Sequence, residues 1–305
     1  MGLNVSIEDT VRKEADKHKN LHLVVVEGIT KLTSGKVESC VSSDFYVGGL
    51  KWNIILVPVG DSLSIGLMLN DSKCVGSNWT VRCNVKLTVY DQHSSLLNLN
   101  NTYSVLFDAN GEKVDVKHSF KDIHNYSTDD IAVFSATVTN VKTKGLNVTS
   151  IPRKMGTAER IKLMEVEKNK SKFTWKITHF SSFVGEHHSS YQFTVGPRRW
   201  FLRMCPKGTL EGKGNSLSLF LHAADYVTGP KTNTLAVYKL RVLDQLKRNH
   251  HEIDQQFWFG SDEHKGEPKF LALDKLHKAS NGFLVNDQIY INIEFLYVAT
   301  SENMI

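Results

Sequence analysis

The sequence predicts an all-β protein built from two tandem antiparallel β-sandwiches joined by a short helical linker. Short segments that alternate apolar and polar residues, separated by turn residues, fill most of the chain, and few segments have helical periodicity. The length of 305 residues suits two domains. A set of residues also recurs at a nearly constant separation, which is typical of tandem copies of one fold. We therefore expect sandwiches at 21–142 and 171–299, with a linker at 143–170.

Composition and charge fit an ordinary globular protein. Hydrophobic residues make up 41% of the chain and charged residues 23%, and the formal net charge is +5; this mixture argues against disorder. Residues 1–150 hold 15 Lys and Arg against 16 Asp and Glu, whereas the rest holds 22 against 16. The basic residues are scattered and form no stripe with aromatic residues, so we expect no nucleic-acid partner.

The N-terminal segment, residues 1–20, is polar and charged and is expected to form a short helix or a flexible arm. Met1 to Ser6 fit the M-G-x-x-x-S pattern of N-myristoylation at Gly2, which chance meets easily. No apolar run of about 18 residues occurs, so we expect no membrane span. We expect a cytoplasmic (or nuclear) protein with reduced thiols, because no apolar leader precedes the cysteines. The cysteines are Cys40, Cys74, Cys83 and Cys205.

The first sandwich is predicted from a series of strands that turn residues separate. These strands are expected at 21–26, 37–47, 50–57, 63–69, 81–90, 103–107, 114–120 and 131–141. The clearest is 81–90, where apolar and polar residues alternate from Val81 to Val89, the period of a strand with one buried face. In the linker, Gly145, Pro152 and Gly156 interrupt regular structure. A short helix is predicted at 157–165, with Thr157 as its N-cap.

The second sandwich opens with its most regular segment, 173–208. Alternating apolar residues predict three strands there, separated by turn residues that include Gly185 and Gly196-Pro197. Trp175 and Trp200 are expected in the core, as is Trp52 of the first sandwich.

The repeat is visible as constant separations between matching residues. Five pairs are separated by 148: Phe45/Phe193, Gly48/Gly196, Trp52/Trp200, Pro58/Pro206 and Gly60/Gly208. After an insertion at 209–216 the separation becomes about 153, as in Asp91/Asp244, and near the end about 157, as in Asp130/Asp287. Loop insertions between copies of one fold produce this drift.

Five segments of the second half carry a family resemblance. They are F-T-W-K-I at 173–177, Y-Q-F at 191–193, P-K-G at 206–208, L-S-L-F-L at 217–221 and G-F-L-V-N-D at 282–287. With these segments in this order, the second half resembles a MATH domain (meprin and TRAF-C homology), a TRAF-like sandwich. The first half looks like a diverged copy that keeps Trp52 and Pro58 but lacks the F-x-W-x-I opening. The tandem arrangement looks most like that of plant TRAF-like proteins.

The resemblance implies a non-enzymatic module that binds partner proteins and needs no cofactor. Members of this family present a shallow groove to short extended peptides, and they often serve as adaptors in ubiquitin-linked or signalling pathways. Carried onto this chain, the groove is expected to include seven residues. They are Phe220, Tyr238, Leu240, Phe257, Phe259, Lys265 and Gly266. The family's W-G-[FY] element reads Lys265-Gly266-Glu267 here, so the usual peptide preference is expected to differ, because charged side chains do not desolvate an apolar residue well.

Other functions have weaker support in the sequence. No cysteine or serine lies in a recognised nucleophile motif, and no His or Cys spacing is that of a metal site. The cluster at 247–251, K-R-N-H-H, is expected to be a solvated hairpin tip, with an electrostatic contact to an acidic partner as the alternative. The alternative to a peptide-binding adaptor is a structural protein that forms a homo-oligomer through its sandwiches.

Overall fold

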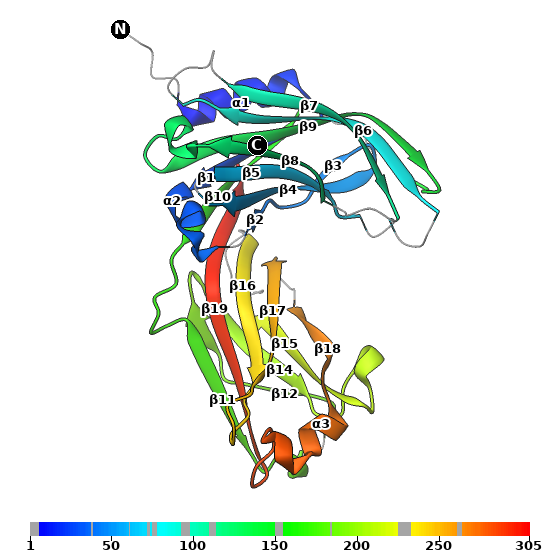
Figure 1. Ribbon diagram of the computed structural model, residues 1–305, viewed down its shortest axis with the longest axis vertical. Helices are drawn as coiled ribbons and strands as arrows, with labels where there is room; N and C mark the ends of the chain where they lie inside the picture. The colour runs from blue at the N-terminus through cyan, green and yellow to red at the C-terminus, as the bar shows by residue number, and fades with distance from the viewer. Residues whose placement is uncertain are drawn as a thin grey trace. The chain divides into compact units, whose positions relative to one another are not determined.

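The computed structural model describes most of the chain as two compact units of β-structure (Figure 1). The described residues are 6–37, 39–60, 62–71, 74, 78–92, 98–109, 114–149, 155–183, 185–224, 233–260 and 264–305. Unit 1 comprises Met1–Leu163 and Ser301–Ile305, and unit 2 comprises Met164–Thr300. The predicted all-β class is confirmed. The myristoylation pattern at Gly2 lies outside the described residues.

Unit 1 is a sandwich of two sheets. Its strands are β1 (Leu21–Glu27), β2 (Cys40–Val41), β3 (Phe45–Val47), β4 (Leu50–Val59), β5 (Ser62–Leu69), β6 (Thr80–Tyr90), β7 (Leu99–Asp108), β8 (Val114–Lys121), β9 (Ile131–Lys144) and β10 (Thr157–Met164). One sheet has the order β10-β1-β9-β6-β7, and the other has the order β2-β4-β5-β8, with β3 beside β4. The alternation predicted for residues 81–90 is present in β6, whose Val81, Cys83, Val85 and Leu87 are buried.

The helices of unit 1 are short. They are α1 (Ile7–Lys17), α2 (Ile29–Lys31), η1 (Leu32–Lys36) and η3 (Ile123–Tyr126). Of the two forms expected for the N-terminal arm, the helix is observed. Ser6 caps α1 by accepting a hydrogen bond from the Asp9 N–H at 3.2 Å. Val11 and Ala15, four residues apart, lie on one face of the helix and are buried against Leu21 and Leu23 of β1.

The predicted linker helix is wrong, because Thr157–Met164 forms strand β10. This strand runs parallel to β1, with His22 opposite Thr157 and Glu27 opposite Lys162. The residues are good helix formers, but the open edge of β1 offers backbone hydrogen-bond partners, and burial of Ala158, Ile161 and Leu163 rewards the extended form. The β1–β10 pair is also a parallel exception to the predicted antiparallel pairing.

A buried polar network ties the end of the chain into unit 1. The carboxylate of Glu159 on β10 is fully buried. It accepts hydrogen bonds from the Ser43 N–H at 2.8 Å, from the Ser43 hydroxyl at 2.7 Å and from the Ser301 hydroxyl, and His22 Nε2 lies 3.1 Å away. The Met304 N–H donates to the Ala158 carbonyl at 2.9 Å. Residues 301–305 therefore complete the first sandwich.

Unit 2 repeats this arrangement. Its strands are β11 (Lys172–Thr178), β12 (His188–Ser189), β13 (Phe193–Val195), β14 (Arg198–Cys205), β15 (Ser216–Ala223), β16 (Asn233–Val242), β17 (His251–Phe259), β18 (His264–Ala272) and β19 (Gln288–Asn303). Its helices are η4 (Phe180–Ser182), η5 (Leu210–Gly212), α3 (Leu273–His277) and η6 (Ala279–Asn281). One sheet contains β17-β16-β19 with β11 beside β19, and the other has the order β12-β14-β15-β18 with β13 beside β14.

The strand pairing confirms the tandem repeat. Strands β1 to β9 of unit 1 correspond in order and pairing to β11 to β19 of unit 2. The matched tryptophans make the same hydrogen bond at the same length: Trp52 Nε1–H donates to the Val47 carbonyl at 3.0 Å, and Trp200 Nε1–H donates to the Val195 carbonyl at 3.0 Å. Both tryptophans are fully buried, as predicted, whereas Trp175 is half-buried against the core of unit 2.

All four cysteines are buried and outside any disulfide, and burial raises the pKa of the Cys83 thiol to about 12. Within the described part of the chain, no helix is long and apolar enough to cross a membrane.

Candidate functional site

Three of the seven predicted groove residues lie in the core of unit 2. Tyr238, Leu240 and Phe259 are fully buried. The ring of Phe259 packs edge-on against Trp200, with 5.0 Å between centroids, and the Tyr238 hydroxyl donates to the Lys265 carbonyl at 3.2 Å. These side chains face the opposite sheet, so the prediction that they line a surface groove needs correction: they fill the interior instead.

Phe257 and Lys265 lie together at the border of the core. Phe257 is half-buried, and its ring contacts Phe259 edge-on at 5.0 Å. The Lys265 ammonium lies 5.7 Å from the centre of the Phe257 ring, within range of a cation–π contact. This contact covers part of the aromatic surface that the sequence suggested would be available to a partner.

Phe220 and Gly266 lie on the outer face of the β14–β15–β18 sheet. They are directly opposite each other on β15 and β18. Phe220 alternates with the core residues Leu219 and Leu221 and points to the other side of the sheet. A Cβ atom on Gly266 would lie 2.1 Å from the Leu219 carbonyl oxygen and 2.5 Å from the Phe220 Cα. Glycine is therefore required here for close backbone approach.

Three rings form a continuous row across this face. Phe201 on β14, His222 on β15 and His264 on β18 occupy adjacent registers. Phe201 and His222 are stacked at 4.8 Å, and His222 and His264 are stacked at 4.7 Å. We call these three residues the aromatic row. Phe220 contacts the row edge-on through His264, at 5.7 Å, but it is only 8% exposed, so the accessible ring surface of this face belongs to the aromatic row.

The outer face has polar groups that lack partners within the described structure. The Nε atom of Arg203 and the Nε2 atom of His222 are buried without a hydrogen bond, although such groups are normally satisfied. Burial lowers the pKa of His222 to about 3, and the positive charges of Arg203, His264 and His187 add to this effect. His222 is therefore neutral at physiological pH. The Arg203 guanidinium lies 5.6 Å from the Phe201 ring, so a positive charge borders the aromatic row.

The outer face of the other sheet is different, because its charges satisfy one another. The Lys239 ammonium pairs with Glu252 at 3.1 Å and with Asp254 at 3.0 Å. The Arg241 guanidinium pairs with Glu252 at 2.7 Å and with Glu294 at 2.8 Å. A partner docking there would first have to break these ion pairs, so the β14–β15–β18 face is the better candidate site.

The edge of this sheet is also open. β18 ends the strand order, and no strand in the described ranges pairs with its far side. An exposed strand edge presents backbone N–H and C=O groups to which another chain can add. Gly266 and His264 belong to this edge strand, so backbone pairing and the aromatic surface are available side by side.

The arrangement does not suggest metal or nucleophile chemistry. Within the described residues, no group of three or more His, Cys, Asp and Glu side chains could hold a metal ion. Cys205 is buried, and burial raises the pKa of its thiol, which disfavours the reactive thiolate.

Four residues of this face were not predicted from the sequence: Phe201, Arg203, His222 and His264. The signal was present for the first three, because they alternate with core residues on β14 and β15. An outward-facing position says nothing by itself about stacking across strands, and only the register of three strands brings the rings together.

Comparison with known proteins gives a consistent result. The model of the MATH domain matches residues 21–138 and 172–295. A MATH domain and coiled-coil domain-containing protein of Arabidopsis thaliana is 33% identical over 126 residues, which cover 40% of this chain and 45% of that protein. Protein RESTRICTED TEV MOVEMENT 3 of the same plant is 31% identical over 138 residues, which cover 42% of this chain and 44% of that protein. The chain thus matches less than half the length of these relatives.

Among solved structures, Notothenia coriiceps TRAF5 is similar to part of the chain. The match has 24% sequence identity and a TM-score of 0.35, and it covers 42% of this chain and 73% of the other.

Proposed function

Because the chain belongs to the MATH domain family, a family of protein-interaction folds, we propose that unit 2 binds an extended segment of a partner protein along β18. In this proposal the segment pairs its backbone with the open edge of β18. Its side chains lie against the aromatic row. The main support for this proposal is that the unpaired edge of β18 lies beside the aromatic row on the same sheet. Main-chain pairing supplies affinity in such complexes, and side-chain pockets supply specificity.

The polar groups of the face indicate which segments would fit. Aromatic or aliphatic side chains would pack on the aromatic row, and a carboxylate oxygen would suit the charged Arg203 guanidinium beside Phe201. The replacement of two family aromatics by Lys265 and Glu267 favours a more polar segment than an all-aromatic groove would take. We expect no catalytic activity, and we propose an adaptor role, with ubiquitin-linked or signalling pathways as its setting. The cytoplasm is the proposed compartment, since a reducing environment suits four buried thiols outside disulfides.

A selection of random peptides displayed on phage against the complete chain would test this proposal. Enriched peptides should bind with micromolar affinity in a fluorescence polarisation assay. The His264→Glu variant should weaken this binding about tenfold or more, because it places a charge in the aromatic row and removes a stacked ring. N-methylation of alternate peptide bonds in the ligand should also weaken binding, since it removes backbone donors.

His277→Glu is the matched control, because His277 is an exposed histidine of α3, outside the aromatic row. It makes the same change in charge and should leave the affinity within about twofold. Peptides whose affinity is insensitive to both His264→Glu and N-methylation would place the binding site elsewhere and contradict the proposal.

A further inference from the structure

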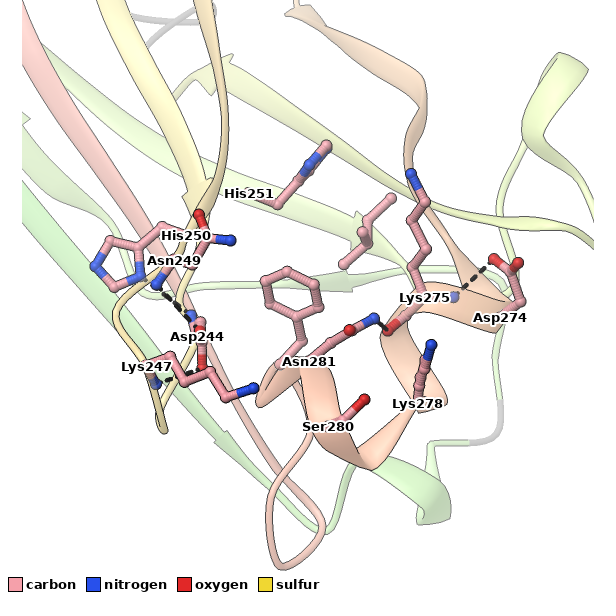
Figure 2. Close-up of a pocket in the computed structure, with 12 residues that line it drawn as sticks. Asp244, Lys247, Asn249, His250, His251, Asp274, Lys275, Lys278, Ser280 and Asn281 are labelled. Atoms are coloured by element: carbon pink, nitrogen blue, oxygen red, sulfur yellow. Dashed lines mark hydrogen bonds between the residues drawn. The ribbon is translucent and has the colours of Figure 1, made fainter.

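The basic cluster at 247–251 lies at the wall of a cleft of about 640 Å³ in unit 2. One wall is the loop between β16 and β17, and the other is formed by α3 and η6. Lys247 contributes a positive charge from the first wall, and Lys275 and Lys278 contribute charges from the second. Figure 2 shows Lys247 on one side of Ser280 and Asn281, with Lys275 and Lys278 on the other side. Two basic segments that are far apart in sequence therefore meet around one cavity.

The three lysines have no carboxylate partner among the described residues. Two acids line the cleft, and the first of them, Asp244, binds the backbone of its own loop. Its carboxylate accepts hydrogen bonds from the N–H groups of Leu246 at 2.8 Å, Lys247 at 3.0 Å and Asn249 at 3.0 Å. These bonds hold its pKa below the usual value, with the Lys247 N–H as the largest cause. The lysine ammonium groups thus remain available to an external anion.

The second acid, Asp274, has a similarly local role. It is exposed at the start of α3, where it accepts a hydrogen bond from the Lys275 N–H at 2.7 Å. His250 offers a further donor to an incoming group. Its Nδ1 atom accepts from the Asp244 N–H at 3.1 Å, so in the neutral ring the proton is on Nε2.

Hydrogen bonds between the walls hold the cleft in shape. The Gln245 N–H donates to the Gly282 carbonyl at 2.8 Å, and its side-chain amide donates to the carbonyls of Phe283 at 3.1 Å and Gln288 at 2.9 Å. The Asn281 amide donates to the Lys275 carbonyl at 2.8 Å and joins η6 to α3. The backbone that carries the lysines is therefore fixed before any ligand binds, which lowers the ordering cost of binding.

We propose that this cleft binds a ligand carrying more than one phosphate group. Compact, strongly hydrated ammonium groups suit phosphate oxygens, and charges on opposite walls require a ligand with several negative groups. Buried Leu271 and Phe283 also line the cleft and offer an apolar floor to the organic part of such a ligand. The volume lies in the range of small-molecule sites, roughly 300–1,000 Å³.

Isothermal titration calorimetry of the complete chain with tripolyphosphate tests this site. We expect one-to-one binding that weakens as salt is raised, since the attraction is between screened charges. The triple variant Lys247→Gln, Lys275→Gln, Lys278→Gln should bind at least about tenfold more weakly. All three lysines are exposed, so the variant should keep the circular dichroism spectrum and melting temperature of the parent.

The matched control is the triple variant Lys168→Gln, Lys207→Gln, Lys213→Gln. These lysines are exposed in the same unit and do not line the cleft, so the control changes the net charge equally and should retain the parent affinity. No tripolyphosphate binding, or equal loss in both triple variants, would overturn the proposal. Binding of an oligoglutamate peptide as tight as that of tripolyphosphate would also overturn it, in favour of an acidic protein segment.

A vesicle assay identifies the source of the phosphate groups. Phosphatidylcholine vesicles that contain phosphatidylinositol 4,5-bisphosphate are sedimented with the protein. Cosedimentation that tripolyphosphate competes away, and that the cleft variant loses, supports a lipid headgroup as the ligand. Tripolyphosphate binding without cosedimentation supports a soluble phosphorylated molecule.

Discussion

At the scale of single residues, close contacts determine how the cleft of unit 2 is built. Gly282 has φ +71°, and a Cβ atom there would lie 2.1 Å from the Asp244 carboxylate oxygen. The same carboxylate organises the loop before β17, and the Gly282 carbonyl anchors Gln245. One glycine therefore allows the two walls of the cleft to approach each other.

Gly282→Ala should lower the free energy of unfolding of unit 2 by about 2–3 kcal/mol, from left-handed backbone strain and from displacement of the Asp244 carboxylate. Urea unfolding followed by circular dichroism measures the effect. Gly214→Ala is the control, because Gly214 has φ +79° but nothing within 4 Å of its virtual Cβ. This substitution should lower the free energy of unfolding only by the strain of the left-handed backbone, about 1–2 kcal/mol. Equal losses in both variants would show that the Asp244 contact adds nothing.

The buried Glu159 network makes a second prediction at this scale. Burial raises the pKa of Glu159, but hydrogen bonds from His22, Ser301 and Ser43 outweigh it, so the pKa lies below 4.5. A carboxyl group whose pKa is lower in the folded state stabilises the fold above its unfolded pKa, and this contribution is lost as pH falls through the folded pKa. The Glu159→Gln substitution should therefore lower the free energy of unfolding by about 2–3 kcal/mol at pH 7.

The difference in the free energy of unfolding between the Glu159→Gln variant and the parent protein should become smaller as pH falls below about 4.5. Urea unfolding at a series of pH values measures it. A constant gap from pH 7 to pH 3 would mean that the ionised carboxylate is not the stabilising form.

At the scale of elements, strands with one buried face could be predicted from the sequence. A strand that forms only because another strand lies beside it could not. Alternation identified β6 because its inward side chains meet the core and its outward ones do not. β10 was predicted as a helix because its residues favour helix, and only the presence of β1 beside it makes the strand the better state.

The candidate site shows the same division. The family resemblance predicted Phe220, Gly266, Tyr238 and Phe259 as groove residues, but Tyr238 and Phe259 lie between the sheets. Strand alternation cannot tell which of two apolar faces is covered, and it cannot reveal a stack such as His222 on His264, which depends on the register between separate strands.

Removal of residues 301–305 should destabilise unit 1 by about 2–4 kcal/mol, because Glu159 loses the Ser301 hydroxyl and Ala158 loses a backbone partner. Hydrogen exchange measured by mass spectrometry should become faster in β10 and β1 than in β14 and β15. Removal of Ile305 alone, a residue that is 36% exposed, is the control and should leave exchange in β10 unchanged. If removal of residues 301–305 left hydrogen exchange in β10 and β1 as slow as in β14 and β15, these residues would not stabilise unit 1.

At the scale of the whole molecule, two copies of one sandwich retain the same internal anchors. In unit 1 the Asp130 carboxylate accepts from the Thr30 N–H at 2.8 Å, and in unit 2 the Asp287 carboxylate accepts from the Ser181 N–H at 2.8 Å. The buried tryptophans behave in the same way. Matching positions can therefore be perturbed in pairs, one in each unit.

Trp52→Phe and Trp200→Phe should each cost about 1–3 kcal/mol, since each leaves a buried carbonyl without its donor. Each should speed hydrogen exchange only in its own unit, and the free-energy losses should add within about 0.5 kcal/mol in the double variant. Trp175→Phe is the control, because the half-buried Trp175 indole makes no hydrogen bond within the described structure. Faster exchange throughout both units after a single substitution would show that they unfold as one.

The return of residues 301–305 to unit 1 has a consequence for the order of events during synthesis. Every residue of unit 2 is translated before the segment that completes unit 1. Domains usually fold as they emerge, the N-terminal one first. While unit 2 is being translated, residues 301–305 are not yet present. During that time β10 lacks the Met304 backbone partner, and the Glu159 carboxylate lacks the hydrogen bond from the Ser301 hydroxyl. Unit 1 can therefore reach its complete structure only after all of unit 2 has been translated.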